Sequence, residues 1–392
     1  MTSKGTQSLT GIRFFAVLMI FLFHYSGRLP INSHFVHAVF DQLFLGVQVF
    51  FVLSGFVICY KYFSGAELKK GFLFTYYLRR FAKIYPTFFI IVTLSFLIWN
   101  FKGIDTDSSF GTYILNITFL KGLSSQYHLT GIGPTWSLTV EEFFYFFSPF
   151  IFVYFKNKGV LFKQVLFWWL TGAVLVALFT ISPVEGFFDN ARFTFFATFF
   201  GRCLEFYLGI WLALYISGRF RTKRFFCYRG SFPLYTIAGL TGMATSILLL
   251  AGLSLIYEQS SVEMWQGLFI ANIVFPVTVL IFFFGLIKEN SKIRSLLNYK
   301  LIQLFGKSSY VFFLIHTGVV ASSVEKYISS NMVVLFIILQ IVSILIYKSF
   351  EMPVNNWIRV KGNNLSKNIY QLDFRSKVSR QQNWESLQGQ EA

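Results

Sequence analysis

Charged residues are scarce in this chain of 392 residues. Only 13% of the residues are Asp, Glu, Lys or Arg, whereas charged residues make up about 25% of soluble domains. Hydrophobic residues reach 55%, aromatic residues 21%, and the mean hydropathy is +0.59. This composition excludes a soluble globular domain and predicts an all-α, polytopic membrane protein surrounded by membrane lipids.

Cysteine is rare, and the common signatures of soluble enzymes are missing. The three cysteines, Cys59, Cys203 and Cys227, have neither metal-binding nor disulfide spacing. The sequence contains no P-loop, no GxGxxG after a strand and no nucleophile elbow. We therefore expect no metal cofactor and none of the nucleotide or serine-hydrolase chemistry that those motifs support.

Acidic residues are few: 17 Asp and Glu face 34 Lys and Arg, for a net charge of +17. A basic balance can indicate nucleic acid, but in a membrane protein it more often reports basic cytoplasmic loops. Hydrophobic run lengths predict ten spans. They lie at about 9–27, 38–60, 84–100, 136–155, 164–181, 201–217, 232–256, 268–287, 303–321 and 332–350.

The loops between these spans predict the orientation. Alternate loops hold 18 basic residues and the remaining loops only five. By the positive-inside rule both termini are expected in the cytoplasm, and no nucleic-acid partner is needed to explain the charge. The basic loops are 61–83, 156–163, 218–231 and 288–300.

The longest loop on the opposite side, 101–135, is expected to contain a short interfacial helix at Phe110–Leu120. Gly131 to Pro134 should stop any helix before Trp136 begins the next span. Two regions are predicted overall: a transmembrane domain at 1–360 and a polar, Gln-, Asn- and Ser-rich cytoplasmic tail at 361–392 that is expected to be disordered.

The first span carries two ionisable side chains, Arg13 and His24. Eleven positions are about three helical turns, so both should point to nearly the same face, roughly 16 Å apart along the axis. Polar groups inside a membrane are costly and usually face a cavity or the bundle interior. The alternative is that Arg13 extends to the interface and His24 caps the far end.

Further polar residues fall at the same depth as His24. Glu141 and Glu142 lie one to two turns into the fourth span, His316 in the ninth and Gln48 in the second. A His beside a carboxylate gains basicity and a fixed tautomer, as a general base requires. We therefore predict a shared cavity in which Glu141 assists His24. The alternative is an interhelical hydrogen-bond network that only stabilises the bundle.

A second polar cluster is expected at the opposite face, where Arg79, Arg80 and Lys83 precede Tyr85-Pro86 and Arg13 lies nearby. Four cations around a vestibule suit a polyphosphate or nucleotide headgroup. The alternative is plain positive-inside anchoring, in which the cations have no ligand.

Six short motifs follow one another between residues 9 and 353. They are Arg13…His24, Gly46–Phe56, Arg80–Pro86, Trp136-Ser137-Leu138…Glu141, Ser309-Tyr310…His316 and Glu351-Met352-Pro353. In this order they resemble the membrane-bound acyltransferase 3 family, which modifies cell-surface glycans, in its stand-alone form. Lys83 replaces the family's second Arg. A Lys keeps the positive charge but cannot form the bidentate contact that an Arg makes with phosphate. Gln48 stands where an Asp is frequent, so it is not expected to act as an acid.

The resemblance implies transfer of an acyl group, usually acetyl, from cytoplasmic acyl-CoA to a hydroxyl of a cell-surface or lipid-linked carbohydrate. It implies a multi-pass protein of the bacterial inner or plasma membrane. His24, assisted by Glu141, would deprotonate the acceptor, with an acyl-His intermediate as the alternative route. Arg13, Arg80 and Lys83 would hold the donor. The supporting residues would be Glu142, His316, Gln48 and Trp136.

A second function is also compatible with buried His and Glu residues, namely a proton-coupled transporter or flippase of a glycan precursor. Such proteins often contain repeated halves and helices broken at matched positions. No internal repeat is evident in this sequence. The sequence therefore favours acyl transfer over transport.

Overall fold

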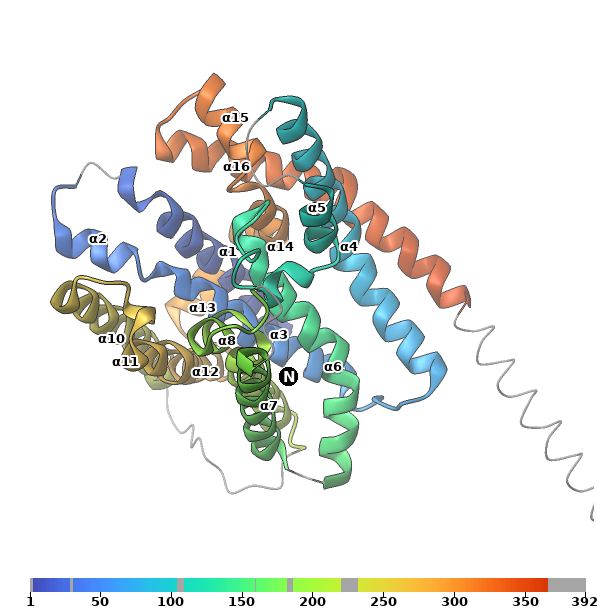
Figure 1. Cartoon of the computed structure of the whole chain (residues 1–392). Helices are drawn as coiled ribbons and strands as arrows, with labels where there is room; N and C mark the ends of the chain where they lie inside the picture. Colours follow the sequence, from blue (N-terminus) through green and yellow to red (C-terminus); the bar gives the residue numbers. More distant parts are fainter. Residues whose placement is uncertain are drawn as a thin grey trace, which may run out of the picture.

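A computed structural model describes residues 3–28, 31–103, 109–158, 160–181, 186–219 and 232–365. Within these ranges the chain forms helices and no β-strand (Figure 1). Among the described residues, nine helices are long and apolar enough to cross a membrane, and a bent helix pair brings the number to as many as ten. The predicted all-α, polytopic architecture of about ten spans is confirmed.

Most spans match the hydrophobic runs, because a membrane helix must satisfy its own backbone hydrogen bonds over its whole apolar length. The helices at or beside the predicted spans are α1 (Ser3–Tyr25), α3 (Gly46–Tyr62), α6 (Trp136–Lys158), α7 (Leu161–Ile181), α9 (Phe199–Ile216), α10 (Leu234–Tyr257) and α12 (Phe275–Lys288). Shorter helices join them: α2 (His34–Phe40), α8 (Ala191–Ala197), α11 (Trp265–Phe269) and α13 (Lys292–Leu297).

The centre of the bundle is the contact between α3 and α9. Small residues allow the two backbones to approach closely. A Cβ at Gly55 would lie 2.1 Å from the carbonyl oxygen of Phe206, and one at Gly209 would lie 2.1 Å from that of Val52. Gly55 and Gly209 therefore serve close helix packing, and any larger side chain at either position would push α3 and α9 apart.

The third span differs from its prediction. One continuous helix, α4 (Lys70–Phe101), begins 14 residues before the predicted start at residue 84. Arg80 and Lys83 therefore lie on a helix that continues through Pro86, not in a loop. The hydrophobic pattern missed this segment because its cations have protein partners: Arg80 donates to the Tyr62 hydroxyl, and Lys83 pairs with Glu351.

The ninth span is not one straight helix. α14 (Lys300–Ile315) and α15 (Val319–Tyr327) meet at an angle of 86°. Between them Gly318 has φ +79°, a left-handed conformation that glycine adopts without steric cost. Irregular backbone at membrane depth is tolerated where it is buried in protein or lines a cavity. This break therefore marks the region around His316 as a candidate site.

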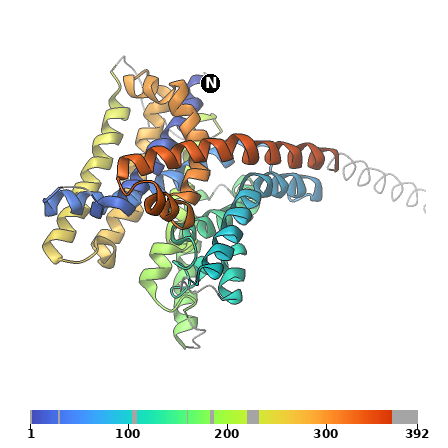
Figure 2. The ribbon, with the colours of Figure 1, turned by 90° about the horizontal axis from the view of Figure 1, so that it is seen from above.

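The last span is longer than predicted. α16 (Met332–Ile346) continues through a π-helical turn, Tyr347–Glu351, and on to Leu365. Figure 2 shows this helix projecting beyond the rest of the bundle. Residues 361–365, predicted as part of a disordered tail, are thus helical. The rest of that predicted tail, 366–392, lies outside the described residues.

The long connection before α6 contains the expected short helix. α5 (Phe110–Ile117) begins after Ser109, whose hydroxyl accepts from the Thr112 amide at 3.2 Å and so caps the helix. The predicted helix, Phe110–Leu120, is thus three residues longer than α5, and its last residue begins a 3₁₀ turn, Leu120–Leu123. A second 3₁₀ turn, Gly133–Thr135, leads directly into α6 at Trp136, as predicted.

Candidate active site

A large cavity lies where α1 ends, and His24 lines it. Its volume is about 990 Å³, at the upper end of the 300–1,000 Å³ usual for small-molecule sites. We call it the imidazole cavity. Four aromatic side chains form part of its wall, and Thr317 and Gly318 at the break between α14 and α15 close one side. The aromatic lining residues are Phe23, Phe44, Trp136 and Phe196.

His24 is exposed in this cavity with a defined tautomer. Its Nδ1 lies 2.8 Å from the carbonyl oxygen of Ile20 and 3.4 Å from Nε2 of His316. A carbonyl can only accept, so Nδ1 carries the proton and Nε2 has the free lone pair. No described residue bonds to that Nε2. His24 can therefore accept a proton from a molecule in the cavity.

His316 lies behind His24 and is completely buried. Its Nδ1–H donates to the Phe313 carbonyl at 2.7 Å, which leaves Nε2 as the acceptor facing His24. The Tyr25 hydroxyl donates to the His316 carbonyl at 2.8 Å. These contacts hold His316 rigidly, so it can fix the orientation of the His24 ring.

The predicted pairing of His24 with Glu141 is not what the structure contains. The two side chains line different cavities, and His24 has His316 as its side-chain partner. Glu141 accepts instead from Ser54 and Tyr145. The pairing was predicted because His24 and Glu141 lie at a similar depth in the membrane. Depth alone does not determine which helix packs against α1 at that level. That depends on the packing of α1 against α14.

Glu141 lines a second, narrower cavity of about 110 Å³. We call it the cation cavity, because Arg13, Arg80 and Lys83 all line it. The structure thus brings together three of the four cations that the sequence grouped. The fourth, Arg79, lines none of the cavities described here and bonds to Asn363 at 3.1 Å.

The three cations differ in how they are held. Arg80 donates to the Tyr62 hydroxyl at 3.4 Å, and its guanidinium lies 5.5 Å from the Tyr62 ring and 5.6 Å from the Tyr145 ring. Lys83 pairs with the buried carboxylate of Glu351. Aromatic faces orient Arg80, which forms no ion pair with a described carboxylate, whereas the charge of Lys83 is largely balanced by Glu351. Arg80 is therefore the better anion ligand.

A third cavity of about 550 Å³, the Lys61 cavity, lies toward the beginning of α1. It is lined by Thr6, Tyr60 and Lys61 among others. Arg13 lines both this cavity and the cation cavity, and Val47 lines both the cation cavity and the imidazole cavity. The three cavities therefore follow one another along α1, from its first turns to its last.

The remaining predicted residues take different positions. Trp136 lines the imidazole cavity. Glu142 lines none of the three cavities. Gln48 is 1% exposed, and neither its amide oxygen nor its amide nitrogen has a partner among the described residues. Gln48 therefore does not contact a ligand in any of these cavities, although its unpaired amide is costly to bury.

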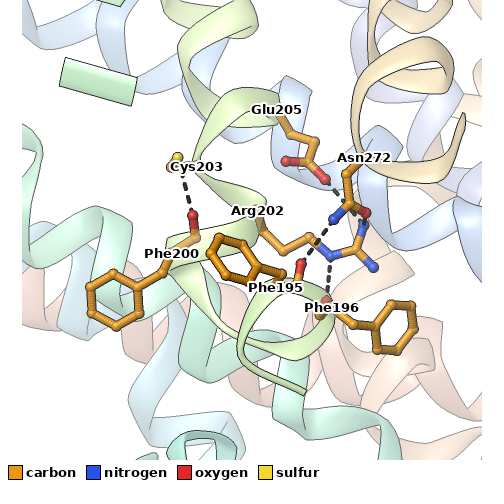
Figure 3. A network of polar contacts seen from close by, with 7 residues as sticks. All are labelled: Phe195, Phe196, Phe200, Arg202, Cys203, Glu205 and Asn272. Carbon is orange, nitrogen blue, oxygen red and sulfur yellow. Dashed lines mark hydrogen bonds and ion pairs between the residues drawn. The ribbon is translucent and has the colours of Figure 1, made fainter. Parts of the chain in front are cut away.

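Sequence reasoning missed a buried network behind the wall of the imidazole cavity (Figure 3). Arg202 donates from Nε to the Phe196 carbonyl at 2.5 Å, and from Nη1 to Asn272 at 2.6 Å and to Glu205 at 3.2 Å. Its guanidinium lies 4.7 Å from the Phe196 ring. Because Phe196 lines the cavity, this network fixes part of its aromatic wall. The sequence contained one signal for this network: Arg202 and Glu205 lie three residues apart inside an apolar run.

Lys121 was also missed. It lies in the 3₁₀ turn Leu120–Leu123 and is 1% exposed, with its amine bonded to the carbonyls of Thr130 and Ile132 at 2.6 and 3.0 Å. Burial lowers the pKa of this amine to about 7. A neutral amine still has two N–H donors for the two carbonyls. Lys121 therefore fastens the segment that leads to Gly133 and Pro134 at the imidazole cavity.

The chain is similar in sequence to several bacterial acyltransferases. It is 28% identical over 228 residues to acyltransferase MdmB of Streptomyces mycarofaciens, covering 53% of this chain and 56% of that protein. It is 26% identical over 200 residues to peptidoglycan O-acetyltransferase OatA of Listeria monocytogenes, covering 46% of this chain and 30% of the relative. No solved structure matches the chain.

A third similarity extends over most of the sequence. The chain is 25% identical over 383 residues to O-acetyltransferase OatA of Staphylococcus aureus, which covers 90% of this chain and 57% of that protein. The matched region thus spans a little more than half of the length of MdmB and of the Staphylococcus aureus OatA, and less than a third of the Listeria monocytogenes OatA. The sequence profile of the acyltransferase domain matches residues 6–348, which include all three cavities. This multi-pass membrane protein belongs to the acyltransferase 3 family.

Proposed function

We propose that this protein transfers an acetyl group from cytoplasmic acetyl-CoA to a hydroxyl of a cell-surface or lipid-linked carbohydrate. The series of three cavities along α1 is the observation that carries the proposal. It has cations in the middle and an unpaired imidazole nitrogen at one end, so that donor and acceptor can approach one reaction point from opposite sides.

The donor would enter through the Lys61 cavity. The basic loops predict that the beginning of α1 faces the cytoplasm, where CoA thioesters are found. Lys61, Arg13 and Arg80 would bind the coenzyme phosphates, and Arg80 suits this role because its guanidinium is oriented by two aromatic rings. The cation cavity is too narrow for the nucleotide, so only the pantetheine arm and the acyl group would pass Val47.

The acceptor would bind in the imidazole cavity, where aromatic walls suit the apolar faces of sugar rings. His24 Nε2 takes the proton of the acceptor hydroxyl while its oxygen attacks the thioester carbonyl carbon. The carbon–sulfur bond then breaks, and the proton passes from His24 to the CoA sulfur. The products are an O-acyl carbohydrate and free CoA. The Ile20 carbonyl keeps the proton on Nδ1 of His24, and His316 holds the ring in position.

Glu141 has a different role in this proposal from direct assistance to His24. It holds Ser54 and Tyr145, and the Tyr145 ring faces the Arg80 guanidinium. Glu141 therefore positions the donor side of the pathway. Trp136 shapes the acceptor side, and the buried Arg202 network supports its neighbour Phe196.

The experiment is a transfer assay in membranes that contain the full chain. Membranes receive acetyl-CoA labelled in the acetyl group, and ester-linked label is measured in the carbohydrate fraction after mild alkaline release. We expect alkali-labile label that is absent with His24→Ala. Mass spectrometry of surface carbohydrate with and without the protein should show a matching acetyl increment. Carbohydrate movement across the membrane without acetyl-CoA consumption would instead support the transporter.

A further inference from the structure

The imidazole cavity is acidic, and this bears on the chemistry of the acceptor. Asp41 and Glu258 line it, and none of its lining residues is Lys or Arg. Its two imidazoles belong to His24 and His128. Burial lowers the pKa of the His128 imidazole, which keeps that ring neutral at pH 7. The fixed charge of the cavity wall is therefore negative.

The two carboxylates come from neighbouring elements. α2 and α10 pack side by side (Figure 1). Asp41 follows the last residue of α2 and accepts from the Ser26 hydroxyl at 3.0 Å. Glu258 follows the last residue of α10. Both side chains are exposed, so neither carboxylate is neutralised by a buried ion pair.

Glu258 occupies an unfavourable backbone position. Its φ is +51°, in the left-handed region where Gly or Asn usually ends a helix. A non-glycine residue is strained in this conformation, and such strain often accompanies function. The surrounding loop holds this geometry, since Ser254 donates to the Gln259 carbonyl and Ser261 donates to the buried amide oxygen of Gln42. Glu258 is thereby kept at the cavity.

Cations close to the cavity are already engaged. Arg28, beyond the end of α1, pairs with Glu325 at 2.8 Å. The Lys121 amine is buried against two backbone carbonyls. Neither cation lines the cavity, so a negatively charged ligand would meet two carboxylates and no cationic partner there. The cation cavity has the opposite charge, as a phosphate-rich donor requires.

We propose that the imidazole cavity selects an acceptor with no negative charge near the accepting hydroxyl, and that Asp41 and Glu258 exclude carbohydrates bearing carboxylate, phosphate or sulfate groups there. This rests on the proposed acyl transfer. Like charges held together in a water-poor cavity repel strongly, whereas neutral sugars and amino sugars meet no such penalty.

The first test uses the natural acceptor. Cells that express the protein are fed labelled acetate, and their surface carbohydrate is digested to short oligosaccharides and separated by anion exchange at pH 7. Label that depends on His24 should pass through the column with the neutral and cationic sugars. Label on the bound, anionic oligosaccharides would overturn the charge selection but leave acyl transfer intact. Absence of His24-dependent label in every fraction would contradict acyl transfer itself.

The second test changes the charge of the cavity. Purified full-length protein in detergent is titrated with tetragalacturonate, an anionic tetrasaccharide, and binding is followed through the fluorescence of Trp136 and the other tryptophans. Glu258→Lys should strengthen tetragalacturonate binding about tenfold at low ionic strength, and 0.5 M salt should remove most of the gain.

Glu263→Lys is the matched control, because Glu263 is exposed on the same loop but does not line the cavity. It should change tetragalacturonate affinity less than about twofold, since an exposed charge outside the cavity acts through water of high dielectric constant. Equal effects of Glu258→Lys and Glu263→Lys would contradict the proposal, as would tight binding of tetragalacturonate to the unmodified protein. Asp41→Lys offers a second, independent variant if Glu258→Lys lowers expression.

Discussion

The imidazole cavity and the cation cavity lie next to each other and share Val47, yet their construction is opposite. The first is about 990 Å³, aromatic and bordered by two carboxylates. The second is about 110 Å³ and is lined by three cations and one carboxylate, that of Glu141. In the proposed reaction the first would hold a bulky sugar and the second a thin, charged donor. The difference supports the proposal that two dissimilar substrates approach one reaction point from opposite sides.

The largest effect is expected at the point where both substrates meet. His24→Ala removes the imidazole nitrogen that is proposed to take the proton of the acceptor, so the acetyl transfer rate should fall about 10²–10⁴-fold. His37→Ala is the matched control, because His37 lies on α2 and lines none of the three cavities. Thermal unfolding of both variants checks that they fold. Full activity in folded His24→Ala would remove the proposed base.

The next largest effect should separate the two sides. Arg80→Ala should raise the KM for acetyl-CoA about 10–100-fold, because hydrogen bonds to charged groups contribute about 1.5–3 kcal/mol. The KM for the acceptor should change little. Arg79→Ala, which removes the neighbouring guanidinium outside the cavity, should leave both values near those of the unmodified protein. An equal rise in both KM values for Arg80→Ala would contradict a separate donor side.

A smaller effect is expected behind the imidazole cavity. His316→Phe keeps the volume of a buried side chain but removes the acceptor that faces Nδ1 of His24. The Ile20 carbonyl still bonds to His24, so kcat should fall only about tenfold, in line with the loss of one hydrogen bond. The pH dependence of kcat should shift, whereas the KM for acetyl-CoA should not.

His316→Gln provides the test of this positioning role, because its amide oxygen can accept from Nδ1 of His24. It should recover part of the activity that His316→Phe loses. A loss as large as that of His24→Ala in both variants would instead make His316 the base.

The smallest effect concerns the segment that borders the imidazole cavity. Burial lowers the pKa of Lys121 to about 7, against 10.5 for a free amine. Between these values the unfolded chain binds the extra proton, so stability should increase as pH rises above 7. From pH 7 to 9 the gain is about 2 kcal/mol.

Thermal unfolding at several pH values measures this gain. Lys121→Met should be less stable, because two buried carbonyls lose their donor, and it should lack the increase with pH. Identical pH profiles for the two proteins would show that Lys121 does not titrate in this range.

Much of the fold could be predicted from the sequence, because apolar run length directly reports where a helix crosses a membrane. The errors occurred where tertiary partners change that signal. α4 can start as early as Lys70 because the cations in its first half have partners: Arg80 donates to the Tyr62 hydroxyl, and Lys83 pairs with Glu351. The break after His316 depends on a glycine with positive φ, which hydrophobicity does not report.

The site was predictable in its parts but not in its pairing. Arg13 and His24, which helical spacing predicted on one face of α1, line different members of the series: Arg13 the cation cavity and His24 the imidazole cavity. The neighbour of His24 could not be derived, because the rotation of α14 and α6 around α1 follows from packing across the bundle. For that reason His316, not Glu141, faces His24. The carboxylates of the acceptor side, Asp41 and Glu258, gave no signal in the sequence.

The most direct test of the account is the sidedness of the reaction. Vesicles reconstituted with the full chain would contain an acceptor extract in the lumen and receive labelled, membrane-impermeant acetyl-CoA outside. Protein molecules whose Arg80 side faces outward should then acetylate the luminal carbohydrate, and Arg80→Ala should abolish this at low donor concentration. Transfer that occurs only when donor and acceptor are on the same side of the membrane would contradict a reaction point reached from two sides.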